Sequence, residues 1–274
     1  MSQIQVPNNF SQILTICRYE LLMGIQGKKI PGILAITIGV AIALLVVPEI
    51  LGGGESESVS QYLIPKIGFG FFLLIITAAL FGSSSLVTEF HERTGYSLFP
   101  NPVSKTTIWF GKFLAAEILG LSVISIFYGI ISIGAYSKFN KIPLETLESF
   151  LFSFVVLTML MSLSFLISSF SRGPTGAVVF VFLLFMLVFP IVDQFVMNLA
   201  EIKPWFSPTF MKGIVENVMT VPYPLDLIPG EMPRGPFDFQ RFVPYIEESL
   251  SVMFVYIVTF CVASIYIFKQ REMK

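Results

Sequence analysis

Charged residues are scarce in this sequence. Asp, Glu, Lys and Arg make up 13% of its 274 residues, against about 25% in soluble globular domains. Hydrophobic residues make up 54%, and the mean hydropathy is +0.80. This composition excludes an ordinary soluble domain and predicts an integral membrane protein. The net charge of −1 gives no basic surface that would favour nucleic acid as a partner.

Histidine and cysteine are also almost absent. The single histidine, His91, begins the motif HERTG, which lacks the second histidine of the zinc-protease motif HExxH. The two cysteines, Cys17 and Cys261, lie in apolar surroundings near opposite ends of the chain, which favours two separate buried thiols over a disulfide. We therefore expect no catalytic site, no bound metal and no cofactor on this chain.

A nucleotide-binding loop is missing as well. Neither Gly27-Lys28 nor Gly111-Lys112 has the earlier glycine or the following Ser/Thr of a P-loop. If ATP drives this protein, another chain must bind it.

Six apolar runs are long enough to cross a membrane, since about 20 helical residues span the roughly 30 Å hydrocarbon layer. Their continuous apolar character excludes the alternating strands of a membrane β-barrel. We therefore predict an all-α integral membrane protein in which residues 1–274 form one transmembrane domain. The predicted spans are 30–50, 67–87, 111–136, 149–170, 175–193 and 249–268.

The distribution of basic residues predicts the orientation of these spans. With the N-terminus inside, the cytoplasmic pieces hold ten of the 17 basic residues and four of the 18 acidic ones. Basic residues concentrate in cytoplasmic loops. Both termini are therefore predicted to be cytoplasmic.

Residues 8–29 form an amphipathic stretch before the first span. Apolar side chains recur every three or four residues, which is typical of a helix with one apolar face. We predict a helix on the inner membrane surface, in contact with lipid. A helix packed on the rest of the protein is the alternative. The recurring side chains are Phe10, Leu14, Cys17, Leu21 and Ile25.

Residues 194–248 contain eight of the 17 prolines and precede the last span. Within them Phe210, Ile214 and Val218 repeat every four residues, which indicates a short helix at the outer interface. We expect an ordered extracellular cap.

A polar segment, 88–110, lies between the second and third spans on the predicted cytoplasmic side. Thr88 to Phe99 can form a short helix that Pro100 stops, and Ser104 is a suitable N-cap for the next helix. A simple connection needs four to six residues or so. This longer segment is therefore predicted to have a role of its own.

The stretch TEFHERTGYSLFPNPVSKTTIWFGKFLA resembles the pattern of type-2 ABC transporter permeases. In that pattern Glu-Arg-x-Gly is followed by a Leu-containing turn, Pro-Val-Ser, and Gly-Lys-Phe at the next helix. The resemblance also covers the plan of an amphipathic N-terminal helix, six spans and an outer segment before the last span. The matching residues are Glu92, Arg93, Thr94, Gly95, Leu98, Pro102, Val103, Ser104, Gly111 and Lys112.

The resemblance implies that this segment is a coupling helix that docks on a separate ABC ATPase subunit. It implies an exporter of the prokaryotic plasma membrane in which two ATPase copies bind ATP. Two permease copies, or two related chains, would form the pore. The residues expected to contact the ATPase are Glu89, Glu92, Arg93, Thr94, Gly95, Leu98, Phe99 and Pro102, with Arg172 of a second inward loop as a smaller contact.

Glu117 lies inside the third predicted span, where a carboxylate is a candidate functional group. It can line the transport path, or be a structural residue near the inner interface. Two other functions stay open: an ion-driven secondary transporter that uses Glu117, and a non-transporting membrane scaffold or assembly factor. The transported substrate and the role of His91 are not predicted.

Overall fold

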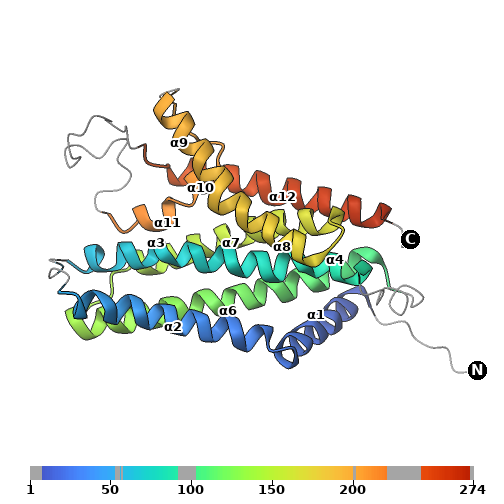
Figure 1. Ribbon diagram of the computed structural model, residues 1–274, viewed down its shortest axis with the longest axis horizontal. Coiled ribbons are helices and arrows are strands. Elements are labelled where there is room, and N and C mark those ends of the chain that lie inside the picture. Colours follow the sequence, from blue (N-terminus) through green and yellow to red (C-terminus); the bar gives the residue numbers. More distant parts are fainter. Residues whose placement is uncertain are drawn as a thin grey trace, which may run out of the picture.

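A computed structural model of the chain describes residues 8–52, 56, 58–91, 103–199, 202–220 and 242–271. The elements in this part of the chain are helices (Figure 1). Six helical stretches are long and apolar enough to cross a membrane, which confirms the predicted all-α fold with six spans. They are Lys29–Ile50, Val59–Glu89, Lys105–Phe139, Glu145–Phe170, Pro174–Met197 and Ile246–Gln270.

Two of these spans are built from several consecutive helical segments. Each contains five residues of π-helix, a local change that often marks functional regions. The second span consists of α3 (Val59–Thr77), the π-helix η1 (Ala78–Gly82) and α4 (Ser83–His91). The fifth consists of α8 (Pro174–Leu183), the π-helix η2 (Leu184–Val188) and α9 (Phe189–Leu199). The other spans are α2 (Lys29–Ile50), α6 (Lys105–Phe139), α7 (Glu145–Phe170) and α12 (Ile246–Gln270).

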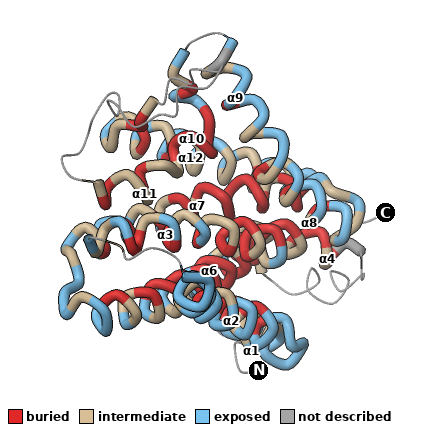
Figure 2. Tube along the Cα trace, turned by 60° about the vertical axis from the view of Figure 1, so that its left-hand side comes forward, coloured by how far each residue is buried: buried red, intermediate tan, exposed pale blue. Residues whose placement is uncertain are grey.

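Helices α6 and α7 form the centre of the bundle, and Figure 2 shows much of their length as buried. Trp109 at the start of α6 stacks on Phe113 and meets the edge of Phe165 from α7. Its Nε1 donates a hydrogen bond to Ser264 Oγ of α12 at 2.9 Å. The fifth span and α12 lie outside this centre and leave broad apolar faces exposed, as expected of helices that contact lipid.

Helix α1 (Asn9–Gln26) packs on α6 and then turns into α2 through Gly27 and Lys28, whose φ of 60° is left-handed. Cys17 is buried, whereas Phe10, Leu14 and Ile25 are exposed. The predicted amphipathic helix is therefore present. One face contacts the protein, and most of its predicted apolar face remains available to lipid.

The polar segment does not begin with a separate helix at Thr88. Thr88 lies inside α4, which continues the second span to His91. Helix α6 then starts at Lys105, and the side chain of Ser104 accepts a hydrogen bond from the Thr107 amide at 3.1 Å, so the predicted N-cap is confirmed. Residues 92–102 lie outside the described part of the chain.

The predicted helix near Phe210 divides into two single turns, α10 (Pro208–Met211) and α11 (Ile214–Asn217). Phe210, Ile214 and Val218 are buried, so their predicted apolar role holds. Turn α11 packs against α3 and α7, and turn α10 packs against α9. The rest of the predicted cap, 221–241, lies outside the described residues.

Candidate functional site: a buried charge cluster

The end of the bundle where α4 stops and α6 starts, here called the α4–α6 end, contains a cluster of three charged side chains. Lys112 of α6 lies with its Nζ 2.5 Å from Glu20 Oε1 of α1 and 2.7 Å from Glu89 Oε1 of α4. The beginning of α1 and the end of α12 lie at this same end (Figure 1). We call Glu20, Lys112 and Glu89 the charge cluster. It joins three helices that are distant in the sequence.

The cluster is largely shielded from water. The side chain of Lys112 is 4% exposed, that of Glu89 10% and that of Glu20 27%. Burying a charge is costly unless an opposite charge compensates it. The two carboxylates therefore stabilise the lysine at this position, and the lysine in turn holds α1 and α4 against α6.

A close helix contact beside the cluster explains how Glu20 reaches Lys112. A Cβ on Gly111 would lie 2.7 Å from two carbon atoms of Ile16 in α1, which is too short for a real contact. Only glycine lets the two helices approach this closely. Cys17 is buried near the same contact, and its burial together with the charge of Glu20 raises the pKa of its thiol.

Basic side chains bind the free carbonyl groups of the helix ends next to the cluster. Arg271 donates hydrogen bonds to the carbonyls of Ser169 at 3.0 Å and Ser171 at 2.6 Å, at the end of α7. Lys105 donates to the carbonyls of Lys269 at 3.0 Å and Arg271 at 2.9 Å, at the end of α12. Cations favour the C-terminal ends of helices. These contacts tie α6, α7 and α12 together.

Glu117 lies deeper in α6 and is 8% exposed. Its Oε2 is 3.4 Å from Thr158 Oγ1 of α7. Its Oε1 is buried without a hydrogen-bond partner among the residues that the structure describes. An unsatisfied buried oxygen is costly and needs an explanation. Glu117 therefore differs from Glu89, whose carboxylate faces a lysine.

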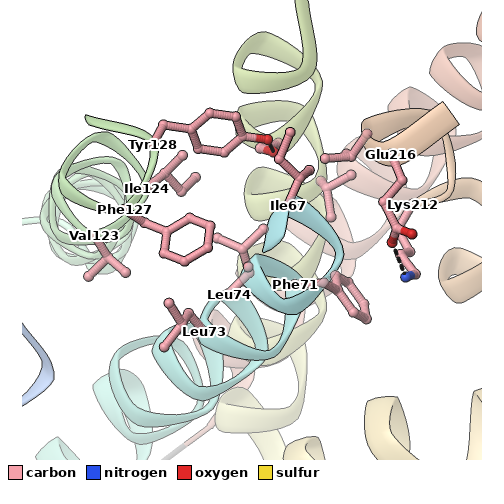
Figure 3. Close-up of a pocket in the computed structure, with 14 residues that line it drawn as sticks. Ile67, Phe71, Leu73, Leu74, Val123, Ile124, Phe127, Tyr128, Lys212 and Glu216 are labelled. Carbon is pink, nitrogen blue, oxygen red and sulfur yellow. Dashed lines mark hydrogen bonds and ion pairs between the residues drawn. The ribbon is translucent and has the colours of Figure 1, made fainter. Parts of the chain in front are cut away.

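At the opposite end of the bundle, the turns α10 and α11 cover a small apolar cavity (Figure 3). The space in it that a water-sized sphere can occupy is about 20 Å³, which is room for roughly one water molecule. Lys212 and Glu216 form an ion pair at 2.7 Å on its cap side. Ser149 Oγ of α7 donates to the Val215 carbonyl at 2.6 Å and so attaches the cap to the bundle.

The sequence matches the family model described as ABC-2 family transporter protein over residues 14–273. The chain belongs to the ABC-2 transporter family. The match covers α1 from Leu14 onward, all six spans and the cap turns, so the whole bundle corresponds to the transporter domain. The protein is therefore a multi-pass membrane permease component. A comparison with curated proteins found no match.

For this ABC-2 permease, most of the residues predicted to contact an ATPase lie outside the described part of the chain. These are Glu92, Arg93, Thr94, Gly95, Leu98, Phe99 and Pro102. Glu89 is described, and its side chain faces Lys112 instead of extending from the bundle surface. Arg172 is exposed in the turn between α7 and α8.

Sequence reasoning missed the partnership of Lys112 with Glu20, which are 92 positions apart. In the sequence, Lys112 stands out only as part of the family pattern. Its position inside an otherwise apolar helix was a usable signal, since a lysine near a membrane span needs a partner. Nothing in the sequence specified which acid would provide it.

Proposed function

We propose that this ABC-2 permease is the membrane subunit of an ATP-driven exporter and that a separate ABC ATPase subunit supplies the energy. The family match over residues 14–273 is the observation that carries this proposal. Six spans then form half of a translocation unit, so two copies, or two related chains, pair with two ATPase subunits. ATP binds to the partner.

The contact with the ATPase is assigned to residues 92–104, which follow the paired Glu89, with Arg172 as a smaller contact. The continuous helix of the second span supports this assignment, because a rigid rod can carry a displacement from residues beyond His91 into the membrane. Glu92 and Arg93 supply charge for pairing. Leu98 and Phe99 supply an apolar anchor of the kind that dominates protein interfaces.

Co-purification of the ATPase with permease variants tests this proposal. Removing one partner of a desolvated charge pair at an interface costs roughly 2–5 kcal/mol. Glu92→Arg and Leu98→Asp should therefore reduce ATPase association while leaving the amount of permease in the membrane unchanged. Arg172→Ala, in the smaller contact, should do much less. Full ATPase retention by both Glu92→Arg and Leu98→Asp would refute the assignment.

We propose a plasma-membrane location with both ends of the chain in the cytoplasm. The concentration of basic residues around the α4–α6 end supports this orientation. Cysteines introduced at Ser56 and Gln240 should react with an impermeant maleimide from outside. A cysteine at Thr106 should react only after permeabilisation, and labelling of all three from outside would exclude this topology.

The environment of Glu117 supports a second candidate function, that of an ion-driven transporter. Its buried oxygen without a partner among the described residues is the observation behind this alternative. Transport in vesicles that lack any ATPase, abolished by Glu117→Gln, would support it. If Glu117→Gln instead changes transport or ATPase activity only when the ATPase is present, Glu117 belongs to the exporter's path.

A further inference from the structure

Two lysines meet at the end of the bundle opposite the charge cluster, where α2 and α6 end and α3 begins (Figure 1). The Nζ atom of Lys66 on α3 lies 3.4 Å from the centre of the Tyr62 ring, and the Nζ atom of Lys138 on α6 lies 5.5 Å from the same ring. Phe139 meets this ring edge-on at 5.6 Å and so attaches the start of α3 to α6. We call Lys66 and Lys138 the lysine pair.

The third helix at this end, α2, contributes a carboxylate. Glu49 Oε1 lies 3.7 Å from the Nζ atom of Lys138. One turn earlier in both helices, a Cβ on Gly134 of α6 would lie 2.6 Å from Leu45 Cδ2 of α2, so the two helices approach closely there. Residues four positions apart lie on the same face of a helix. The contact between α2 and α6 therefore fixes the separation of Glu49 and Lys138.

Lys66 lies inside a membrane span and is only 6% exposed. It is about two turns, or roughly 10 Å, beyond the start of α3. Its ammonium donates a hydrogen bond to the Tyr62 carbonyl at 2.9 Å. Among the residues that the structure describes, no carboxylate lies within ion-pair distance of Lys66. Lys112, which is similarly buried, has two such carboxylates.

The charges at this end do not balance. The lysine pair carries two positive charges, and within the described part of the chain Glu49 is the one carboxylate that pairs with either lysine. Glu49 is 60% exposed, so its contact with Lys138 is weak and easily replaced. An aromatic ring and one carbonyl stabilise the Lys66 ammonium less than an opposite charge would. The arrangement therefore favours an additional anion beside Lys66.

We propose that Lys66 and Lys138 form a binding site for a phosphate-bearing ligand, and that Glu49 releases Lys138 when this ligand binds. A phosphate group carries the required negative charge, and its several oxygens can accept hydrogen bonds from both ammonium groups. An ionisable side chain inside a span is a functional candidate by default. This site needs no ATPase, so it stands independently of the proposed function.

Two sources can supply the phosphate group: a phospholipid headgroup and a soluble phosphomonoester. Headgroups lie where membrane spans end, which is where the lysine pair is located. Ile42 and Val46 are exposed on the same side of α2 as Glu49 and can contact the acyl chain of such a lipid. The chemistry of recognition is the same for both sources, so the experiment has an arm for each.

Native mass spectrometry of the delipidated permease measures binding of phosphatidylglycerol, with diacylglycerol of the same acyl chains as the control that lacks the phosphate. Lys66→Met should weaken binding of phosphatidylglycerol at least about tenfold, because a charged hydrogen-bond donor is lost. Lys138→Met should also weaken it, whereas Lys138→Arg keeps the charge and should retain most of the affinity. Glu49→Gln frees Lys138 and should raise the affinity up to about fivefold. Lys141→Met, at an exposed lysine just after α6, is the matched control and should change nothing.

Thermal unfolding provides a second readout. Without ligand, Lys66→Met should unfold at the same temperature as the wild type or higher, because it removes a buried charge that has no counter-charge among the described residues. Saturating phosphatidylglycerol should stabilise the wild type and Lys141→Met but not Lys66→Met. A marked loss of stability in ligand-free Lys66→Met would show that the chain itself neutralises Lys66, and would overturn the proposal.

Glycerol 3-phosphate distinguishes the two sources in the same assays. Binding of the phospholipid alone, weakened by Lys66→Met, assigns the site to a lipid headgroup. Binding of glycerol 3-phosphate, weakened by the same variant, assigns it to a soluble phosphomonoester. The proposal fails if neither compound binds, or if Lys66→Met and Lys138→Met both bind as the wild type does. It fails equally if binding appears only in the double variant Glu55→Gln/Glu57→Gln, since these acids, which lie outside the described residues, would then occupy the site in the wild type.

Discussion

Lys112→Met should be among the most destabilising single changes in this protein. Methionine fills a similar volume but removes the only cation between Glu20 and Glu89 that the described contacts provide. Two carboxylates would then remain largely buried beside each other. Breaking a buried ion pair by removing one partner costs about 3–5 kcal/mol.

This cost should appear as a lower unfolding temperature of the purified permease. A change of 1 kcal/mol shifts the midpoint by roughly 2–4 °C in a domain of 150–250 residues, so a decrease on the order of 10 °C is expected. Tryptophan fluorescence is a suitable probe, because Trp109 is buried at the start of α6, one turn before the cluster.

A variant without any of the three charges is the matched control. Glu20→Leu, Glu89→Leu and Lys112→Met together remove all three charges, and replacing a whole buried ion cluster by apolar residues of similar volume is often neutral or stabilising. The triple variant should therefore be more stable than Lys112→Met alone. A loss of less than about 1 kcal/mol in Lys112→Met, the value of an exposed pair, would refute this reasoning. A triple variant as unstable as the single one would refute it equally.

Three further experiments test the packing at the two ends of the bundle. Gly111→Ala should destabilise the protein by about 1–3 kcal/mol, because the added Cβ would lie 2.7 Å from Ile16. The control Gly129→Ala, in the same helix but with open space around it, should be neutral or slightly stabilising. Thermal unfolding compares the two variants. The rate of alkylation of Cys17 should still increase with pH at values where the rate for an exposed thiol is already constant, because burial and the nearby carboxylate of Glu20 raise the pKa of Cys17. Peptide mass spectrometry at several pH values measures this rate. Ser149→Ala should cost about 1–3 kcal/mol and loosen the cap turns, since it leaves a carbonyl of the cap without its donor; thermal unfolding and protease digestion measure both.

The spans were predictable because each is specified by its own residues. An apolar run of twenty residues can satisfy its backbone in lipid only as a helix, and this local rule located all six. It placed the ends less well: the third span was predicted as 111–136 but extends over Lys105–Phe139. The polar ends of a membrane helix continue beyond the hydrocarbon layer, so hydropathy underestimates helix length.

The predicted start of the segment's helix at Thr88 was wrong for a related reason, because Thr88–His91 belong to α4, whereas residues 92–99 lie outside the described part of the chain. The segment's charged residues indicated a break with the apolar helix before it. Glu89 does not interrupt that helix, because Lys112 neutralises it inside the bundle. The charge pattern of one segment does not reveal an ion-pair partner in another segment. Sequence reasoning therefore predicted a break at Thr88 in a helix that continues to His91.

The ion pair between Lys112 and Glu89 also gives Glu89 a different role from the acidic residue that follows it, Glu92. The carboxylate of Glu89 is already 2.7 Å from the buried Lys112, so a positive charge on a partner protein would add little stabilisation. Breaking the buried ion pair with Lys112 would cost more free energy than a new contact with that partner would contribute. Glu89 is therefore suited to fixing the end of α4, and under the proposed function the ATPase contact falls to the charges that follow it, Glu92 and Arg93. The family pattern begins with the same pair, Glu-Arg, directly after the point where the ion-paired helix ends. Under the proposed function, attachment and recognition thus fall within the five consecutive residues 89–93, so that a contact on the last two can act on the helix that Glu89 holds.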